Sequence, residues 1–285
     1  MKKIIVIVML ISLSFNFTEM AYCADKNEKT DKNNKTVTTV ETKTPVRIHI
    51  KKPVGKRSES DDLKLRLVMA TLNAEHEKVI DLVTIALNKG EKEKIFTTPQ
   101  QESEAYTMRG SSESALGRIV EAEHDFEIAT DLDPKNYSAY DEKTILYCRQ
   151  KDYKKALKNS LMAVETSGKY ISYAYNNLAM VYLYLKEYDK ALETVNKSLA
   201  IDSTKGNPND TKGDILLHMG RAGEALEYFN KAIAKSTSIV PIYNRGLCYL
   251  ALGNKDAAIK DFEKVVTRGG ENAYEAQMQL NKLRK

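Results

Sequence analysis

Histidine and cysteine are scarce in this sequence, and their scarcity limits the chemistry open to the protein. Four histidines occur in 285 residues, namely His49, His76, His124 and His218. None has the spacing of a metal ligand to another histidine or to a cysteine. A glycine-rich phosphate-binding loop and a nucleophile elbow are also missing. We therefore expect no catalytic residue, no metal and no cofactor, and the sequence predicts a protein that is not an enzyme.

Long hydrophobic runs are also lacking. The longest apolar stretch, Ile4–Phe17, follows two lysines and is shorter than the roughly 20 residues a membrane-spanning helix needs. Small residues follow it, so residues 1–24 are predicted to be a secretory signal peptide, cleaved after Cys23 or Ala24. The segment "MAYC" also resembles a bacterial lipobox, although bulky Tyr22 stands where a small residue is expected. A lipoprotein and an uncleaved anchor remain alternatives, and membrane association is expected only in those two cases.

Most of the positive charge is confined to one segment. The formal net charge is +5, and residues 25–60 carry ten Lys and Arg against five Asp and Glu. This segment is rich in Lys, Thr and Asn, lacks aromatic residues, and is predicted to be a disordered linker. The remainder is nearly neutral, which argues against a nucleic-acid-binding body. Within the linker, "PVRIHIKK" alternates apolar and polar residues, which leaves open a strand that could add to a sheet edge.

A repeat runs through the rest of the chain. Alanines recur about every 34 residues, at Ala122, Ala156, Ala191, Ala225 and Ala258. A large apolar residue follows most of them by four positions, namely Phe126, Val195, Phe229 and Phe262. A further alanine often follows three positions later, so each unit predicts one amphipathic helical face.

This pattern resembles the tetratricopeptide repeat family, whose unit is a helix–turn–helix of 34 residues. In the first unit the signature positions hold Tyr106, Gly110, Ala122, Phe126, Ala129 and Pro134. The second unit departs from the pattern at Lys143, Thr144 and Ser160. The resemblance implies an all-α, right-handed superhelical solenoid, with the first helix of each unit lining a concave groove.

The predicted organisation follows from this phase. Residues 1–24 are the signal peptide, 25–60 the basic linker, and 61–102 a degenerate helical hairpin with an inserted loop. Five repeats occupy 103–136, 137–171, 172–205, 206–238 and 239–272, and residues 273–285 form a capping helix that covers the last apolar face. Cys148 and Cys248 fall about three units apart, too far for a disulfide, and are predicted to be buried free thiols.

Projection of the first helices predicts the lining of the groove. The candidate partner-binding residues are Asp141, Ile145, Arg149, Tyr173, Asn176, Asn177, Met180, Tyr184, Asp210, Asp214, His218, Tyr243, Asn244 and Leu247. Tyr173, Tyr184 and Tyr243 are not claimed by a core position of the family. The resemblance places Asn177 and Asn244 where related repeats hold a ligand's backbone with an amide. The basic clamp of chaperone-binding members is missing, because Thr107 and Ser111 occupy its positions.

Together the signal peptide and the resemblance predict an exported protein–protein interaction scaffold. Its partner would be a peptide or helix of a bacterial envelope protein, held in the groove in the periplasm or cell envelope, and nucleic acid would not be a partner. The alternative is a structural or tethering protein that acts mainly through the basic tail on an anionic surface. In a third arrangement, the basic linker folds back over the mildly acidic part of the groove until a partner competes.

Overall fold

The computed structural model describes residues 58–89, 95–168, 171–204, 207–270 and 272–284. Within these ranges the protein consists of thirteen helices and no strand, as the sequence predicts. The predicted signal peptide and all but the last three residues of the predicted linker lie outside the described residues. The helices divide between two compact units, residues 1–146 and 147–285, with the boundary inside helix α7 (Tyr137–Arg149).

The first unit contains two helical hairpins and most of α7. Its helices are α3 (Glu59–Leu72), α4 (His76–Leu87), α5 (Pro99–Ala115) and α6 (Ile119–Leu132). The hydroxyl of Ser58 accepts a hydrogen bond from the Asp61 backbone N–H and caps α3. Thr98 caps α5 in the same way, and Pro99 occupies its first turn, where no intrahelical N–H is needed. Helix α3 therefore begins at Glu59, before the predicted end of the linker, and α5 begins four residues before the predicted repeat start at 103.

The predicted inserted loop contributes to the core of the first unit. Ile95 and Phe96, between α4 and α5, are buried in the same cluster as Leu63 and Val83. Their burial ties the α3–α4 hairpin to α5 through apolar contact. The segment therefore helps to hold together a hairpin that departs from the repeat length.

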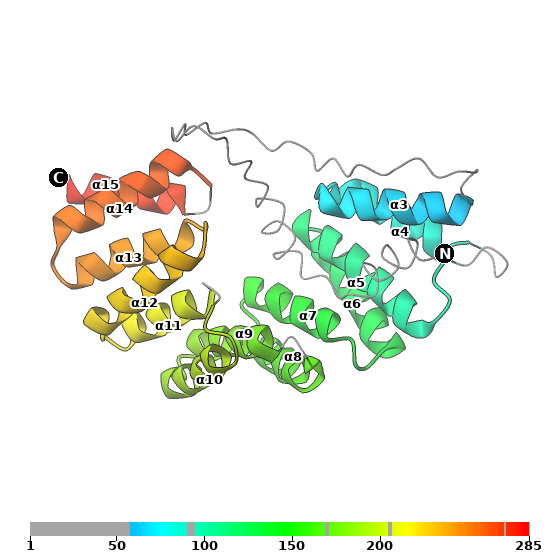
Figure 1. The fold of residues 1–285 in the computed structure, drawn as a ribbon, viewed down its shortest axis with the longest axis horizontal. Helices are drawn as coiled ribbons and strands as arrows, with labels where there is room; N and C mark the ends of the chain where they lie inside the picture. The colour runs from blue at the N-terminus through cyan, green and yellow to red at the C-terminus, as the bar shows by residue number, and fades with distance from the viewer. Residues whose placement is uncertain (1–57, 90–94, 169–170, 205–206, 271, 285) are drawn as a thin grey trace, which may run out of the picture. The chain divides into compact units, whose positions relative to one another are not determined.

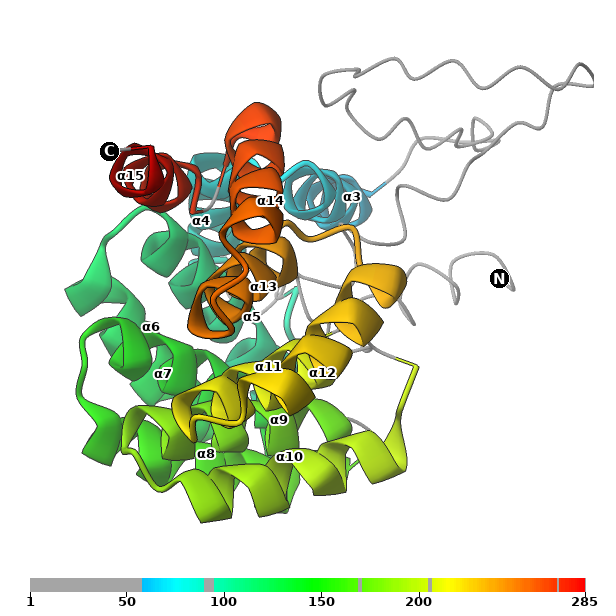
Figure 2. The same ribbon diagram turned by 90° about the vertical axis from the view of Figure 1, so that its left-hand side faces the viewer.

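The second unit continues the pairing of helices. Its helices are α8 (Tyr153–Thr166), α9 (Ile171–Tyr184), α10 (Tyr188–Ile201), α11 (Asn207–His218), α12 (Ala222–Lys235), α13 (Val240–Ala251), α14 (Lys255–Arg268) and α15 (Ala273–Leu283). Figures 1 and 2 show α11 to α15 lying side by side in chain order, and each contacts the next. Helix α15 buries Ala276 and Leu280 against the last hairpin and so covers its apolar face.

Packing within three hairpins depends on a glycine facing a phenylalanine. A Cβ added to Gly110, Gly213 or Gly246 would lie 2.8, 2.7 or 2.6 Å from Cε1 of the phenylalanine sixteen residues later. Those residues, Phe126, Phe229 and Phe262, are fully buried. The small residue on the first helix and the large one on the second thus fit together, which gives the sequence repeat its physical basis.

The turn inside each hairpin is also repeated. After the first helix, one residue adopts positive φ, and the backbone N–H of the residue directly after it donates to the carbonyl oxygen five positions before that donor. Glycine fills this position at Gly220, where φ is 75°, but lysine fills it at Lys186, where φ is 61°. Lys186 is exposed in the turn between α9 and α10.

Candidate functional site

The structure sorts the predicted groove residues by exposure. The exposed ones are Ile145, Arg149, Tyr184 and His218. The half-buried ones are Tyr173, Asn177, Met180, Asp210, Asp214, Asn244 and Leu247. The buried ones are Asp141, Asn176 and Tyr243. Whether any of them binds a partner stays a prediction.

Tyr243 requires a correction. The sequence predicts an exposed aromatic side chain there, but Tyr243 is 9% exposed and belongs to the core cluster of α13, α14 and α15. Its ring lies 5.7 Å from that of Phe262, centroid to centroid. Burial raises the pKa of its phenol. Tyr243 is therefore a packing residue of the last hairpin.

Asp141 and Asn176 are also buried, at 4% and 5% exposure, so neither is an open lining residue of a groove. Asn176 lies on α9, which contacts α11 of the next repeat. A projection of one helix does not include this cover from the neighbouring repeat, which explains the error for Asn176. Its Oδ1 is buried without a hydrogen-bond partner.

Several tyrosines assigned to the core are less buried than predicted. Tyr106, Tyr140, Tyr175, Tyr182 and Tyr249 are all half-buried. A cation lies over the ring in three of them: Arg109 over Tyr106, Lys190 over Tyr182 and Arg245 over Tyr249. In these three tyrosines a charged side chain lies over one face of the ring, while the rest of the half-buried ring packs against the protein.

The first helices α9, α11 and α13 form one surface of the second unit. Helix α11 contacts both α9 and α13, so three repeats present their first helices next to each other. We call the half-buried residues on it, Tyr173, Asn177, Met180, Asp214, Asn244 and Leu247, the first-helix face. Asn244 Nδ2 donates to Asp210 Oδ1 of the preceding repeat at 3.2 Å. The polar groups of this face thus link one repeat to the next.

His218 ends the line of polar residues along α11. Its Nδ1 lies 3.2 Å from Asp214 Oδ1 and 2.9 Å from the Asp214 carbonyl oxygen. The hydrogen bond to the Asp214 carboxylate raises the pKa of His218 to about 9, although burial opposes the rise. Its imidazole therefore carries a positive charge at neutral pH.

Two aromatic pairs connect neighbouring repeats. Tyr153 at the start of α8 stacks on Tyr184 at the end of α9, with ring centroids 5.3 Å apart. One repeat later, Tyr188 at the start of α10 faces His218 at the end of α11, at 6.3 Å. Tyr153 and Tyr188 were not among the candidate residues predicted from the sequence. They could have been found because they occupy the same position in successive repeats.

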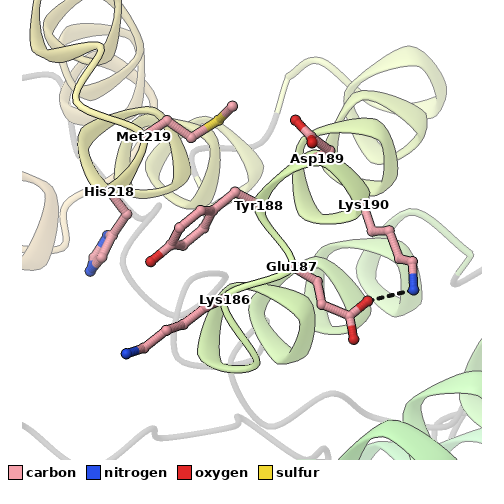
Figure 3. A pocket seen from close by; sticks show the side chains of 7 residues that line it. All are labelled: Lys186, Glu187, Tyr188, Asp189, Lys190, His218 and Met219. Atoms are coloured by element: carbon pink, nitrogen blue, oxygen red, sulfur yellow. Dashed lines mark ion pairs between the residues drawn. The ribbon is translucent and has the colours of Figure 1, made fainter.

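A shallow depression of about 600 Å³ surrounds the second aromatic pair. Its lining residues are Lys186, Glu187, Tyr188, Asp189, Lys190, His218 and Met219. Figure 3 shows Lys186, the hydroxyl of Tyr188 and the ring of His218 pointing to the same side. Lys190 Nζ forms an ion pair with Glu187 Oε2 at 2.5 Å. The Asp189 carboxylate points away from the side of Lys186, Tyr188 and His218.

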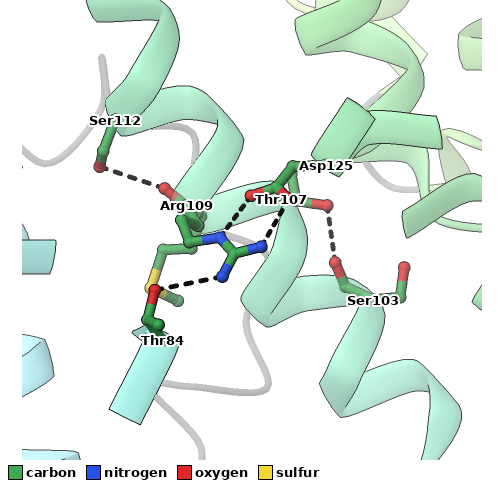
Figure 4. A network of polar contacts seen from close by, with 7 residues as sticks. Thr84, Ser103, Thr107, Arg109, Ser112 and Asp125 are labelled. Atoms are coloured by element: carbon green, nitrogen blue, oxygen red, sulfur yellow. Dashed lines mark hydrogen bonds and ion pairs between the residues drawn. The ribbon is translucent and has the colours of Figure 1, made fainter. Parts of the chain in front are cut away.

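A buried ionic network in the first unit has a structural explanation. Arg109 donates to both carboxylate oxygens of Asp125 and to Thr84 of the preceding hairpin (Figure 4). Ser103 and Thr107 are satisfied nearby by backbone carbonyl oxygens. Because nearly every polar group shown is paired within the protein, the network holds helices together and leaves no group poised for chemistry.

Two glutamates of the first unit have perturbed acidity. Burial, reinforced by Asp133, raises the pKa of Glu104 to about 7. Burial, reinforced by Asp125, raises the pKa of Glu113 to about 7 as well, and its Oε2 has no hydrogen-bond partner. No histidine or cysteine joins them in a metal-binding group, and the described residues contain no cluster of three or more such ligands.

The two remaining cysteines are free thiols. Cys248 is buried, and its Sγ donates to the Ala222 carbonyl oxygen at 2.9 Å, whereas Cys148 is only half-buried. Burial raises the pKa of both, to about 11 for Cys148, so neither is an activated nucleophile. In the ranges that the structure covers, no helix is both long and apolar enough to span a membrane.

Comparison with known proteins agrees with the fold. Tetratricopeptide repeat family models match residues 138–204, and residues 209–234 and 241–268. These matched residues are tetratricopeptide repeats. These matches cover α7 to α14, where the glycine–phenylalanine packing and the repeated turn recur.

Curated relatives share only part of this repeat protein. The Hsp70-Hsp90 organising protein of Plasmodium falciparum is 29% identical over 122 residues, 40% of this chain and 22% of that protein. Human tetratricopeptide repeat protein 6 is 23% identical over 44% of this chain and 24% of its own length. The chain therefore spans about a quarter or less of the length of these relatives.

Solved structures establish the fold. PilW, described as a widely conserved type IV pilus biogenesis factor, aligns with a TM-score of 0.63 and 16% identity over 79% of this chain and 100% of its own. A thermophilic tetratricopeptide repeat protein of Thermus thermophilus aligns with a TM-score of 0.57 and 17% identity over 64% of this chain and 98% of its own. At these identities the likeness is one of fold: an all-α solenoid of tetratricopeptide repeats.

Proposed function

We propose that this protein is a non-enzymatic scaffold of a bacterial cell envelope, whose first-helix face binds a peptide or helix of a partner protein. Tetratricopeptide repeats indicate a protein–protein interaction scaffold. The observation that carries the proposal is the contact of α11 with both α9 and α13, which joins residues of three repeats into one surface. An extended or helical segment is long enough to use several repeats at once.

The chemistry of this surface suits a polypeptide ligand. Asn177 and Asn244 carry amides that can donate and accept, as a peptide backbone requires. Tyr173, Met180 and Leu247 add apolar surface around them. Charges of one sign do not dominate, so shape and hydrogen bonding, more than long-range attraction, would select the partner.

The cellular setting is a separate part of the proposal. Its support is the predicted signal peptide at residues 1–24, which would send the protein to the periplasm or the cell envelope. Lipidation at Cys23 would instead give an outer-membrane lipoprotein. PilW shares the fold and is described as a pilus biogenesis factor, so envelope assembly, secretion or the building of pili are suitable processes to examine first. Cell fractionation with mass spectrometry of the mature N-terminus separates cleavage after Ala24 from a lipidated Cys23.

The binding role is tested by affinity capture from the envelope of the native cells. The mature chain is compared with an Asn177→Ala/Met180→Ala variant on the first-helix face and with a Glu193→Ala/Lys197→Ala control. The control removes an exposed ion pair on the second helix α10. We expect a partner retained by the parent and the control and lost by the first variant. Retention by all three proteins would overturn the assignment to this face.

The basic tail supports a second candidate function, tethering to an anionic surface. The observation that favours it is the excess of ten basic over five acidic residues in segment 25–60. Vesicles or cell-wall polymer should then bind the chain in a strongly salt-dependent manner. Deletion of residues 25–57, which spares the Ser58 cap, should abolish that binding. Persistence of binding after the deletion would reject this candidate.

A further inference from the structure

The aromatic pairs and the depression lie along one edge of the second unit. We call Tyr153, Tyr184, Lys186, Tyr188 and His218 the turn edge. Tyr184 ends α9, Lys186 lies in the turn, and Tyr188 begins α10, so the two pairs are connected within five residues of chain. Tyr184 is 43% exposed, and the His218 side chain is 51% exposed. This edge therefore presents rings from successive repeats to the outside.

Lys186 and Asp189 are the charged lining residues of the depression without a described ion pair, and the Asp189 carboxylate points away from the side of Lys186. Glu187 neutralises Lys190, and Asp214 neutralises His218. Lys186 is exposed and forms no ion pair among the described contacts. It points to the same side as the Tyr188 hydroxyl and the His218 ring (Figure 3). The depression is thus suited to a single carboxylate, approached by Lys186 and by ring edges that carry partial positive charge.

We propose that the turn edge is a second interaction surface, which binds an acidic, extended segment of a partner protein. One carboxylate of that segment lies between Lys186 and His218, and the adjoining side chains lie over Tyr188 and Met219. This surface goes beyond the proposed function. Of the residues of the turn edge, the sequence predicts a partner contact only for Tyr184 and His218, and it places that contact in the groove. A partner that crosses from one repeat to the next meets both aromatic pairs in turn.

The charge pattern favours a protein segment over a nucleic acid. Binding of nucleic acid draws on several unpaired cations that each neutralise a phosphate. Here Lys190 and His218 are paired, and on the side from which the Asp189 carboxylate points away, Lys186 is the one unpaired cation beside apolar ring and thioether surface. Acidic side chains interspersed with aromatic, proline or aliphatic residues match that combination.

The probe for this surface is a phage-displayed library of random dodecapeptides selected on the whole chain. Enriched peptides are synthesised and titrated by calorimetry against the parent and three variants. Lys186→Gln removes the unmatched cation from an exposed turn without loss of a described contact. Lys260→Gln makes the same change on the exposed side of α14 as a matched control, and Asn177→Ala tests the first-helix face. Circular dichroism and thermal unfolding verify that all variants keep the parental fold.

We expect enrichment of acidic peptides whose affinity falls about five- to tenfold with Lys186→Gln and less than about twofold with Lys260→Gln. Acidic peptides that bind Lys186→Gln as well as the parent would overturn the proposal. Peptides that lose affinity only with Asn177→Ala would also overturn it, yet would support binding at the first-helix face. Failure to enrich any peptide would count against both surfaces.

Discussion

Arg109 donates from Nε and Nη2 to the two carboxylate oxygens of Asp125, at 2.6 and 2.7 Å. Arg245 repeats this geometry on Asp261, at 2.7 Å for both bonds. In each case a further guanidinium nitrogen reaches the second helix of the preceding hairpin. The arginine thus joins the two helices of its own repeat to the repeat before it, through charges that are largely withdrawn from water.

Asp261→Ala should destabilise the protein strongly, because the largely buried guanidinium of Arg245 loses its carboxylate partner and keeps only the hydrogen bond to Asn230. We expect a loss of about 3 kcal/mol in the free energy of unfolding, measured by urea denaturation. The double variant Arg245→Met/Asp261→Leu removes both charges and should recover most of that loss. If the double variant were as unstable as the single one, the side chains would matter through packing and not through the ion pair.

Gly246→Ala should destabilise the last hairpin, since the new Cβ would lie 2.6 Å from Phe262 Cε1. Overpacking of this kind costs about 1 to 3 kcal/mol, measured by thermal or urea unfolding. Gly223 is the matched control, because it lies in α12 with open space around its Cα. Gly223→Ala should raise stability by about 0.5 to 1 kcal/mol through helix propensity. Equal effects at the two sites would refute the close glycine–phenylalanine fit.

Tyr243→Ala and Tyr184→Ala should differ sharply in stability, although the sequence treats the two tyrosines alike. Tyr243 is 9% exposed and contacts Phe262, so its truncation should cost about 3 kcal/mol. Tyr184 is 43% exposed and stacks on Tyr153, so its truncation should cost about 1 kcal/mol. Equilibrium unfolding in urea measures both. A smaller loss at Tyr243 than at Tyr184 would contradict its place in the core.

His218 should make a small contribution to stability that depends on pH. Its pKa is raised from 6.5 to about 9 by Asp214, so the folded state holds the proton more tightly than the unfolded chain. The stabilisation is therefore complete below about pH 6.5 and is lost as the pH rises to about 9. Because the side chain is half-exposed, the contribution should stay under about 1 kcal/mol.

The test compares the parent with His218→Gln across that range of pH. The difference in unfolding free energy should shrink toward pH 9, and an NMR titration of the imidazole should place its midpoint well above 6.5. Because the Tyr188 ring faces the imidazole, the chemical shifts of its ring protons should change over the same range of pH as those of His218. A midpoint near the ordinary value would show that the contact with Asp214 does not persist in solution.

The repeat and the hairpin could be predicted from the sequence because both depend on local spacing. Ala191 and its counterparts recur in phase, and Gly246 precedes Phe262 by sixteen residues, as Gly110 precedes Phe126. That distance spans one turn between two helices, so it records contacts inside a single hairpin. The all-α fold and the tetratricopeptide repeat therefore follow from the sequence alone.

The tertiary structure alone decided which residues of a helical face stay open. Tyr243 and Tyr184 both project from first helices, yet the packing of α13, α14 and α15 buries one and leaves the other exposed. The contact of Tyr188 with His218 joins residues thirty positions apart, from different hairpins. Helical periodicity fixes the face on which a side chain lies, whereas the stacking of whole hairpins, which depends on many distant contacts, fixes what covers that face.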